Sequence, residues 1–184
     1  MSEIIPAILA TNTADLSDKI SELPDDVKFI HIDVLEQDFW TETNIDFEAH
    51  LMVKEPDKII ERWIKRGAKR IILHSLGGST SKLIGVEIGL GVEVGIPLET
   101  IFSLIPQADF VHLMSIDALG TQGDNFEPII FDRIRKVKER FPQIPISVDG
   151  GINVTNYQAL KNSGVNRLVV GSGFKELWKL LTKK

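Results

Sequence analysis

The sequence predicts an α/β protein built from parallel βαβ units, and a minimal (β/α)₈ barrel is the favoured arrangement. Short runs rich in Ile, Val and Leu recur along the chain, as they do in parallel strands that helices cover. Amphipathic helical patterns lie between most of these runs. The 184 residues give only about 23 per βα unit, whereas such a barrel usually has about 200 or more. The chain is therefore predicted to form a minimal barrel or an incomplete one.

Eight candidate strands follow one another along the chain, and each is short, apolar and rich in β-branched residues. In order, they are Ile4–Leu9, Lys28–Val34, Ile45–Met52, Arg70–His74, Val92–Ile96, Phe110–Met114, Ile144–Val148 and Arg167–Val170.

Six helical patterns separate these strands. They are Ala14–Leu23, Asp57–Arg66, Ser81–Leu90, Ile129–Phe141, Thr155–Asn162 and Phe174–Leu181. The second has good end signals because Pro56 precedes it and Gly67 follows it. The third is weaker because glycines interrupt it. Between Asp33 and His50 the chain is too short for a turn, a helix and a strand, so one outer helix is expected to be missing or reduced after strand 2.

Composition narrows the classes of protein. The chain has no cysteine, which excludes disulfides, thiolate nucleophiles and cysteine-ligated metal sites. Its net charge of −5 does not fit a basic nucleic-acid-binding surface. No apolar run approaches the roughly 18 residues that span a bilayer, and the N-terminus has no secretory pattern. We expect residues 1–184 to form a single soluble, cytoplasmic domain with no nucleic-acid or membrane partner.

Polar residues fall at the ends of the predicted strands. His31 and Asp33 are two residues apart and share one face of a strand, as do His50 and Met52 on the next strand, and Asp149 ends the seventh. In an α/β barrel these strand ends form one mouth. Two imidazoles and two carboxylates suit a divalent zinc, iron, manganese or cobalt ion. A single strand histidine is more often a core residue, so the prediction depends on all four meeting.

Five motifs run in order along almost the whole chain. They read Ile-Pro-Ala-Ile-Leu at 5–9, Ile-His-Ile-Asp-Val at 30–34, Ala-His-Leu-Met-Val-Lys-Glu-Pro at 49–56, Val-Asp-Gly-Gly-Ile-Asn at 148–153 and Gly-Ser at 171–172. Together they resemble the ribulose-phosphate 3-epimerase family. That resemblance implies a TIM (β/α)₈ barrel and an isomerase of the pentose phosphate pathway, which interconverts D-ribulose 5-phosphate and D-xylulose 5-phosphate with one divalent metal ion (Zn, Fe, Mn or Co).

The resemblance also implies roles for particular residues. The metal ligands would be His31, Asp33, His50 and Asp149, with Asp33 and Asp149 also acting as the catalytic acid/base pair. Two opposed carboxylates suit C3 epimerisation because the proton leaves one face and returns on the other, while the metal stabilises the enediolate. The residues expected to contact the sugar phosphate are Met52, Met114, Gly120, Gly150, Gly151, Gly171 and Ser172.

The chain departs from the family pattern at several positions. Ala7 stands where the family has serine, Leu35 where it has methionine, and the loop at 117–122 lacks the Asn-Pro-Gly-Phe-Gly-Gly-Gln motif. Two alternative functions therefore stay open. One is an epimerase of another ketose phosphate, such as D-allulose 6-phosphate, and the other is a non-catalytic descendant that binds a metal or a phosphorylated ligand.

Further residues lie outside the family pattern. We expect His112 to be a buried, hydrogen-bonded histidine, with a substrate contact as the alternative, and His74 to be structural or to line the mouth. Phe39 and Trp40 lie where the outer helix is missing. An uncovered apolar groove there would be unusual for a soluble protein. Either these residues fold back over it or a second subunit covers it, and we expect a homo-oligomer, a dimer or larger.

Overall fold

The computed structural model describes residues 2–76, 85–117 and 120–182, and its sheet is a closed barrel. Eight parallel strands pair in chain order, and the last pairs with the first. They are β1 (Glu3–Leu9), β2 (Phe29–Val34), β3 (Asp46–Leu51), β4 (Arg70–Leu73), β5 (Glu87–Val92), β6 (Phe110–Met114), β7 (Ile146–Asp149) and β8 (Arg167–Val170). The predicted (β/α)₈ barrel is confirmed.

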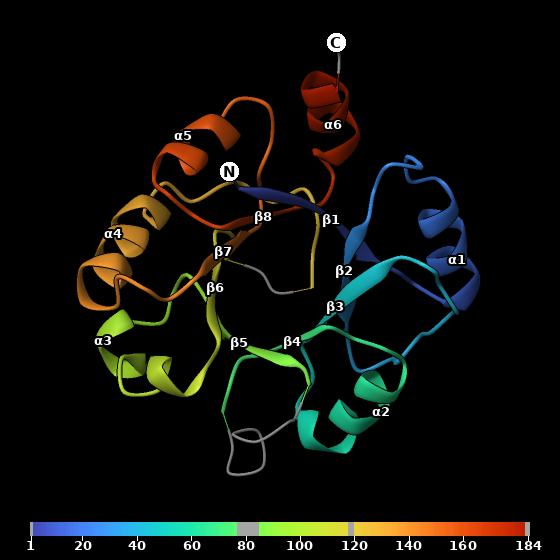
Figure 1. Cartoon of the computed structure of the whole chain (residues 1–184), viewed down its shortest axis with the longest axis horizontal. Helices are drawn as coiled ribbons and strands as arrows, with labels where there is room; N and C mark the ends of the chain where they lie inside the picture. Colours follow the sequence, from blue (N-terminus) through green and yellow to red (C-terminus); the bar gives the residue numbers. More distant parts are fainter. Residues whose placement is uncertain (1, 77–84, 118–119, 183–184) are drawn as a thin grey trace.

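Helices ring the outside of this barrel (Figure 1). They are α1 (Thr13–Ser21), η1 (Pro56–Lys58), α2 (Ile60–Lys65), α3 (Leu98–Ile101), η3 (Ile105–Gln107), α4 (Ile130–Arg140), α5 (Tyr157–Asn162) and α6 (Phe174–Thr182). Their apolar faces pack on the outward side chains of the strands, with Trp63 of α2 and Leu160 of α5 fully buried. In the part of the chain that is described, no helix has the length and apolar character needed to cross a membrane.

The fifth strand differs from the prediction. The sequence predicted a strand at 92–96 after a helix at 81–90, but residues 87–92 form β5; residues 81–84 of that helix lie outside the described residues. The strand was missed because glycines occupy its inward positions. A Cβ on Gly89 would lie 2.4 Å from the Phe110 ring, so the absent side chain makes room for that phenylalanine inside the barrel.

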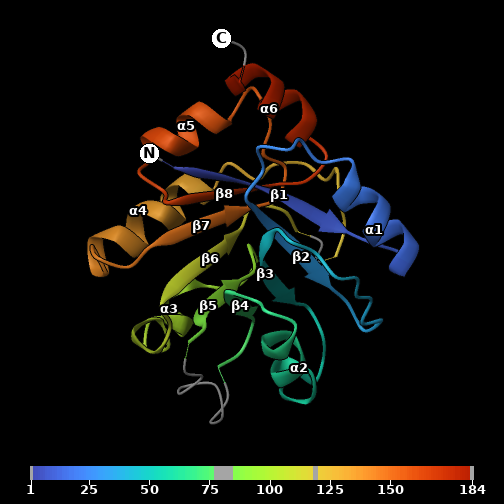
Figure 2. The same ribbon diagram turned by 45° about the vertical axis from the view of Figure 1, so that its right-hand side comes forward.

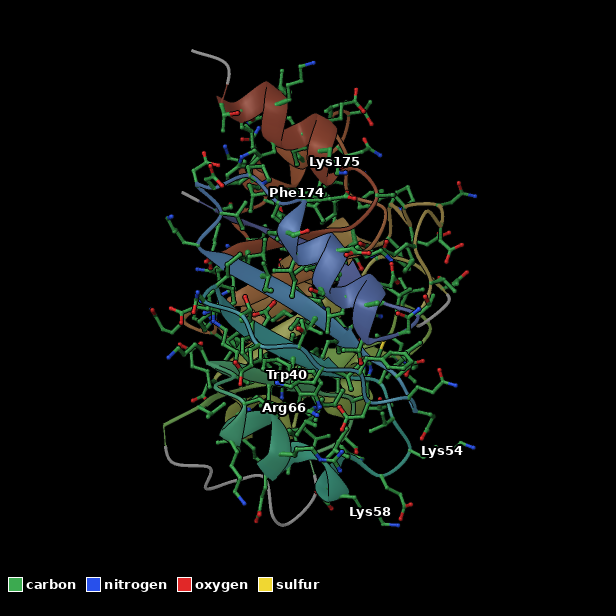
Figure 3. All side chains as sticks on the ribbon, turned by 90° about the vertical axis from the view of Figure 1, so that its right-hand side faces the viewer. Trp40, Lys54, Lys58, Arg66, Phe174 and Lys175 are labelled. Atoms are coloured by element: carbon green, nitrogen blue, oxygen red, sulfur yellow. The ribbon has the colours of Figure 1, made fainter. Side chains whose placement is uncertain are left out.

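The connection between β2 and β3 contains no helix, as predicted. Residues 35–45, all of them described, run as irregular chain between α1 and α2 (Figure 2). Trp40 packs against the rings of Phe47 and Trp63, at centroid distances of 5.2 and 5.5 Å. The guanidinium of Arg66 lies 5.3 Å from the Trp40 ring centroid, and the two side chains adjoin in Figure 3. Trp40 therefore folds back over the strands that a helix would otherwise cover.

A salt bridge holds this connection in place. Asp38 accepts a hydrogen bond from Nη1 of Arg66 at 2.5 Å and pairs with Arg62 as well, so both α2 arginines contact one carboxylate. Such pairs near the surface contribute little individually. Here they orient the segment so that Trp40 faces the barrel.

The amino-terminal half of the barrel interior is charged. Arg70 lies 3.2 Å from Glu48, 3.4 Å from Glu3 and 3.5 Å from Glu87. Arg167 adds a contact of 3.0 Å to Glu87. Glu48 is fully buried and also contacts His31. The network therefore connects the floor of the barrel to the histidines above it.

Candidate active site

A cavity of about 460 Å³, including its open mouth, lies at the carboxyl ends of the strands. Both carboxylates predicted to be catalytic line it, together with every residue predicted to contact substrate. Its described lining consists of Ala7, Asp33, Met52, Met114, Ile116, Gly120, Thr121, Gln122, Gly123, Asp149, Gly150, Gly151, Ile152, Gly171 and Ser172. The sequence therefore identified residues that the fold brings to one place.

His31 lies directly beneath this cavity, fully buried. Its Nδ1 is 2.8 Å from Oε1 of Glu48, and since a carboxylate only accepts, Nδ1 donates that hydrogen bond. The opposite nitrogen, Nε2, is 3.2 Å from Oδ1 of Asp33 and 3.8 Å from Oδ2 of Asp149. The ring is thus held from below and presents Nε2 to both carboxylates.

His50 approaches the same carboxylates from β3. Its Nδ1 lies 3.5 Å from Asp33 Oδ1 and 3.8 Å from Asp149 Oδ2, and it is buried without a hydrogen-bond partner. Its Nε2 is 2.8 Å from Nε2 of His74, at the end of β4. His74 therefore orients His50, as Glu48 orients His31. His74 also borders a neighbouring surface depression, which fits the expectation that it is structural or lines the mouth.

His112 comes from β6 and is fully buried. Its Nε2 lies 3.3 Å from Oδ2 of Asp149, so the expectation of a buried, hydrogen-bonded histidine is confirmed. Its ring stacks on His31 at a centroid distance of 5.5 Å and an angle of 14°. Ligand atoms of His31, His50, His112 and Asp149 lie within 4.8 Å of one another.

The two carboxylates have opposite pKa shifts. Burial alone would raise the pKa of Asp33, but its close contacts with His31 and His50 outweigh burial and hold that pKa well below its usual range. Burial raises the pKa of Asp149 to about 6, and the nearby charge of Asp33 adds to this rise. The difference follows from the two close histidine contacts of Asp33, to His31 at 3.2 Å and to His50 at 3.5 Å.

The neighbouring histidine and glutamate form a charged pair. Burial lowers the pKa of His31, yet hydrogen bonds to Asp33 and Glu48 raise it well above the ordinary value. Burial raises the pKa of Glu48, but the hydrogen bond with His31 brings it down to about 2. Three carboxylates thus surround the imidazole of His31. Their combined negative charge favours a positive charge in the site.

The residues fit a divalent metal ion. Two donors that are each about 2.1 Å from one ion lie roughly 3.0–3.4 Å apart at tetrahedral or octahedral angles. The distances from the ring nitrogens of His31 and His50 to the carboxylate oxygens of Asp33 and Asp149 run from 3.2 to 3.8 Å. The unpartnered Nδ1 of His50 points at both carboxylates, and this mixture of imidazole and carboxylate is one that transition metals take.

The other side of the cavity is formed by glycine turns. Gly150 and Gly151 follow β7 with φ of +111° and +62°, and a Cβ on Gly151 would lie 2.8 Å from the Phe126 backbone. Gly171 and Ser172 lie between β8 and α6. None of the described lining residues is basic, so an anionic group here would depend on backbone N–H groups and polar side chains.

The loop after β6 lies across the mouth of the barrel. Nε2 of Gln122 is 3.4 Å from the carbonyl oxygen of Ala7 on β1. Gly120, predicted from this loop, lines the cavity, and a Cβ there would lie 2.8 Å from Leu35. Ala118 and Leu119 of the same loop lie outside the described residues.

Comparison with known proteins identifies the family. The family model described as the ribulose-phosphate 3 epimerase family matches residues 3–175. The chain belongs to the ribulose-phosphate 3-epimerase family. Similar relatives include the ribulose-phosphate 3-epimerases of Chlamydia muridarum (29% identical, covering 93% of this chain and 87% of that protein) and Mycobacterium leprae (25% identical, covering 92% and 86%). The family is one of isomerases.

Solved structures support the fold independently. The tryptophan synthase α-subunit of Pyrococcus furiosus is similar with a TM-score of 0.68, at 13% identity, over 95% of this chain and 89% of that one. At this identity the likeness concerns the barrel alone. The epimerase family and the barrel predicted from sequence are both confirmed.

The sequence analysis missed Glu48 and favoured a core position for His112 over a role in the site. Glu48 lies two residues before His50 on the same strand and so faces the barrel interior with it, which is the same signal that singled out His31 and Asp33. His112 shares its face with Met114 and was read as a core residue. Its contact with Asp149 depends on β6 and β7 being neighbours, with Met114 in register with Asp149.

Proposed function

We propose that this chain is a metal-dependent sugar-phosphate 3-epimerase, which in the simplest case interconverts D-ribulose 5-phosphate and D-xylulose 5-phosphate. The observation that carries the proposal is that ring nitrogens of His31 and His50 lie 3.2–3.8 Å from carboxylate oxygens of Asp33 and Asp149, where three separate strands meet beneath an open cavity. Family membership supports the same reaction.

Those four residues would hold the divalent ion. When bound, the ion supplies Lewis-acid stabilisation of the negative charge that develops beside the C2 carbonyl. His31 is fixed by Glu48 and His50 by His74, so both rings are held in position before the ion arrives. The donor set fits zinc, iron, manganese or cobalt.

Asp33 and Asp149 would exchange the proton at C3. They come from β2 and β7, which β8 and β1 separate in the barrel, so they approach a bound sugar from different sides. One carboxylate removes the C3 proton, and the other delivers a proton to the opposite face of C3. Met52 and Met114 line the cavity and exclude water around this carbon.

The phosphate would bind at the opposite wall. Backbone N–H groups of Gly150, Gly151 and Gly171, with the hydroxyl of Ser172 just before α6, are suited to a dianion. Glycines serve here because the backbone must come close to the ligand. Gly120 and Gln122 would cover it from the loop after β6.

The test is exchange of the C3 proton of ribulose 5-phosphate with solvent deuterium in metal-loaded protein. Asp33→Asn and Asp149→Asn should each abolish exchange while circular dichroism stays unchanged. Asp46→Asn, an exposed carboxylate at the amino-terminal end of β3, is the matched control and should exchange at the wild-type rate. Near-normal exchange in either active-site variant would refute the two-base mechanism.

A second candidate is an epimerase of another ketose phosphate, such as D-allulose 6-phosphate. Ala7 lines the cavity without a hydroxyl, and Met52 also borders a second open depression beside His74 and Glu93, which leaves room beyond the first cavity. Measuring kcat/KM on pentulose and hexulose phosphates decides between them, because a clear preference for the pentulose removes this candidate.

A further inference from the structure

We propose that His112 is a fifth protein ligand of the metal, so that three imidazoles and two carboxylates form its inner shell. This inference rests on the proposed function, because it concerns the same ion. It adds a residue to the four-residue set that the family pattern implies. That residue, His112, lies outside the sequence motifs that carry the resemblance.

The geometry around one carboxylate oxygen supports this assignment. Oδ2 of Asp149 has three ring nitrogens around it: Nε2 of His112 at 3.3 Å, Nε2 of His31 at 3.8 Å and Nδ1 of His50 at 3.8 Å. Two of these separations are too long for hydrogen bonds. All three are close to the spacing of neighbouring ligands on one ion, which is roughly 3.0–3.4 Å for bonds of about 2.1 Å.

The orientation of the histidine rings supports the same assignment. His112 stacks nearly parallel on His31 and meets His50 edge-on, at a centroid distance of 4.9 Å and an angle of 65°. The two rings come from β2 and β6, four strands apart in the barrel, and each places its Nε2 near Oδ2 of Asp149, at 3.8 Å for His31 and 3.3 Å for His112. His112 therefore occupies a position equivalent to that of His31, which the proposed function already assigns to the metal.

The surroundings of the other ring nitrogen, Nδ1 of His112, bear on the same assignment. Nδ1 of His112 is buried without a hydrogen-bond partner, and so is Oγ of Ser147, its register partner on β7. An imidazole that binds metal through Nε2 carries its proton on Nδ1 and needs an acceptor there. The Ser147 hydroxyl lies at the register position on the adjoining strand and has no other partner, so it is the group available to accept from this Nδ1–H.

The inner shell has a consequence for the choice of metal. Imidazole suits zinc, cobalt and iron, whereas manganese and magnesium favour oxygen ligands. A third imidazole shifts the site toward the nitrogen-preferring ions. We therefore expect the protein to bind Zn²⁺ or Co²⁺ in preference to Mn²⁺, by a wider margin than a site with two imidazoles.

The experiment counts imidazoles directly. X-ray absorption at the zinc edge of Zn²⁺-loaded full-length protein should fit three imidazoles in the wild type and two in His112→Leu and His112→Gln. The glutamine variant retains an amide donor for Asp149, so it separates a ligand from a hydrogen-bond donor. His74→Leu is the matched control: its ring contacts the ligand His50 at 2.8 Å but is not itself among the candidate ligands, so the count should stay at three.

Zinc affinity, measured by competition with a chelator, gives a second readout. Loss of a supporting residue costs roughly 10–100-fold, and we expect His74→Leu to fall in that range. Both His112 variants should lose more than this. If His112→Leu does not fold, His112→Gln and the wild-type count still decide the matter.

The outcomes separate this inference from the proposed function. A wild-type protein that exchanges the C3 proton but shows two imidazoles keeps the epimerase and overturns the role of His112. Wild-type zinc affinity in His112→Gln overturns it too. Three imidazoles without C3 exchange supports the ligand set and removes the epimerase assignment.

Discussion

Replacing Glu48 with glutamine tests how the barrel interior supports the site. Glu48 is fully buried, accepts a hydrogen bond from His31 at 2.8 Å and contacts Arg70 at 3.2 Å. Glutamine preserves the shape and one acceptor but removes the charge. The pKa of Glu48 falls from 4.5 to about 2 on folding, which corresponds to about 3 kcal/mol of stability.

Glu48→Gln should therefore lower the free energy of unfolding by about 3 kcal/mol above pH 5 in chelator-treated protein. At about 2–4 °C per kcal/mol for a chain of this size, Tm should fall by about 6–12 °C. Because the folded pKa is depressed, the stabilisation is present above pH 4.5 and is lost as pH falls toward 2. The difference between variant and wild type should shrink over that range.

Urea denaturation at several pH values between 3 and 8 measures this difference. Glu61→Gln, an exposed carboxylate on α2, is the control and should leave the free energy of unfolding unchanged. Zinc affinity of Glu48→Gln should also fall roughly 10–100-fold, since His31 loses its charged acceptor. A difference in stability that is the same at pH 3 and pH 8 would show that the buried charge is not its source.

Three further predictions concern single residues. In chelator-treated protein, Asp149→Asn should raise the free energy of unfolding at pH 7 by about 1–3 kcal/mol, because burial and Asp33 raise the pKa of Asp149 to about 6. For the same reason, the wild type should lose stability as pH rises from 3.8 to 6. Urea denaturation measures both effects. Gly151→Ala should cost about 2 kcal/mol, because its φ is +62° and its Cβ would meet the Phe126 backbone, whereas Gly95→Ala, with open space around it, should be nearly neutral in the same thermal melts. Trp40→Ala should cost about 2–3 kcal/mol and increase binding of a hydrophobic dye, since Trp40 covers Phe47 and Trp63; unchanged dye binding would contradict its covering role.

Strand periodicity and the positions of His31, Asp33, His50 and Asp149 were sufficient to predict the barrel and the residues at its mouth. Side chains two residues apart share a face, and parallel strands end at one rim, so these residues had to meet if the barrel closed. The missing helix after β2 followed from chain length alone. These are local rules, and they apply without knowledge of the partners of any strand.

Features that depend on neighbouring strands were harder to predict. β5 was misplaced because its inward Gly89 complements Phe110 on β6, a fit that appears only once the two strands pair. The contact of His112 with Asp149 depends in the same way on β6 and β7 lying side by side. Glu48, in contrast, was within reach of the sequence rules, since it precedes His50 by two residues.

The pairing of Gly89 with Phe110 has a consequence for how this barrel can change over time. One strand supplies the volume that its neighbour omits, so neither position can vary freely. An alanine at 89 would require a smaller ring partner at 110, and a smaller residue at 110 would open a void unless 89 grew. Mutational drift at the barrel floor should therefore proceed through linked changes in two adjacent strands, while the histidines and carboxylates above it stay unchanged.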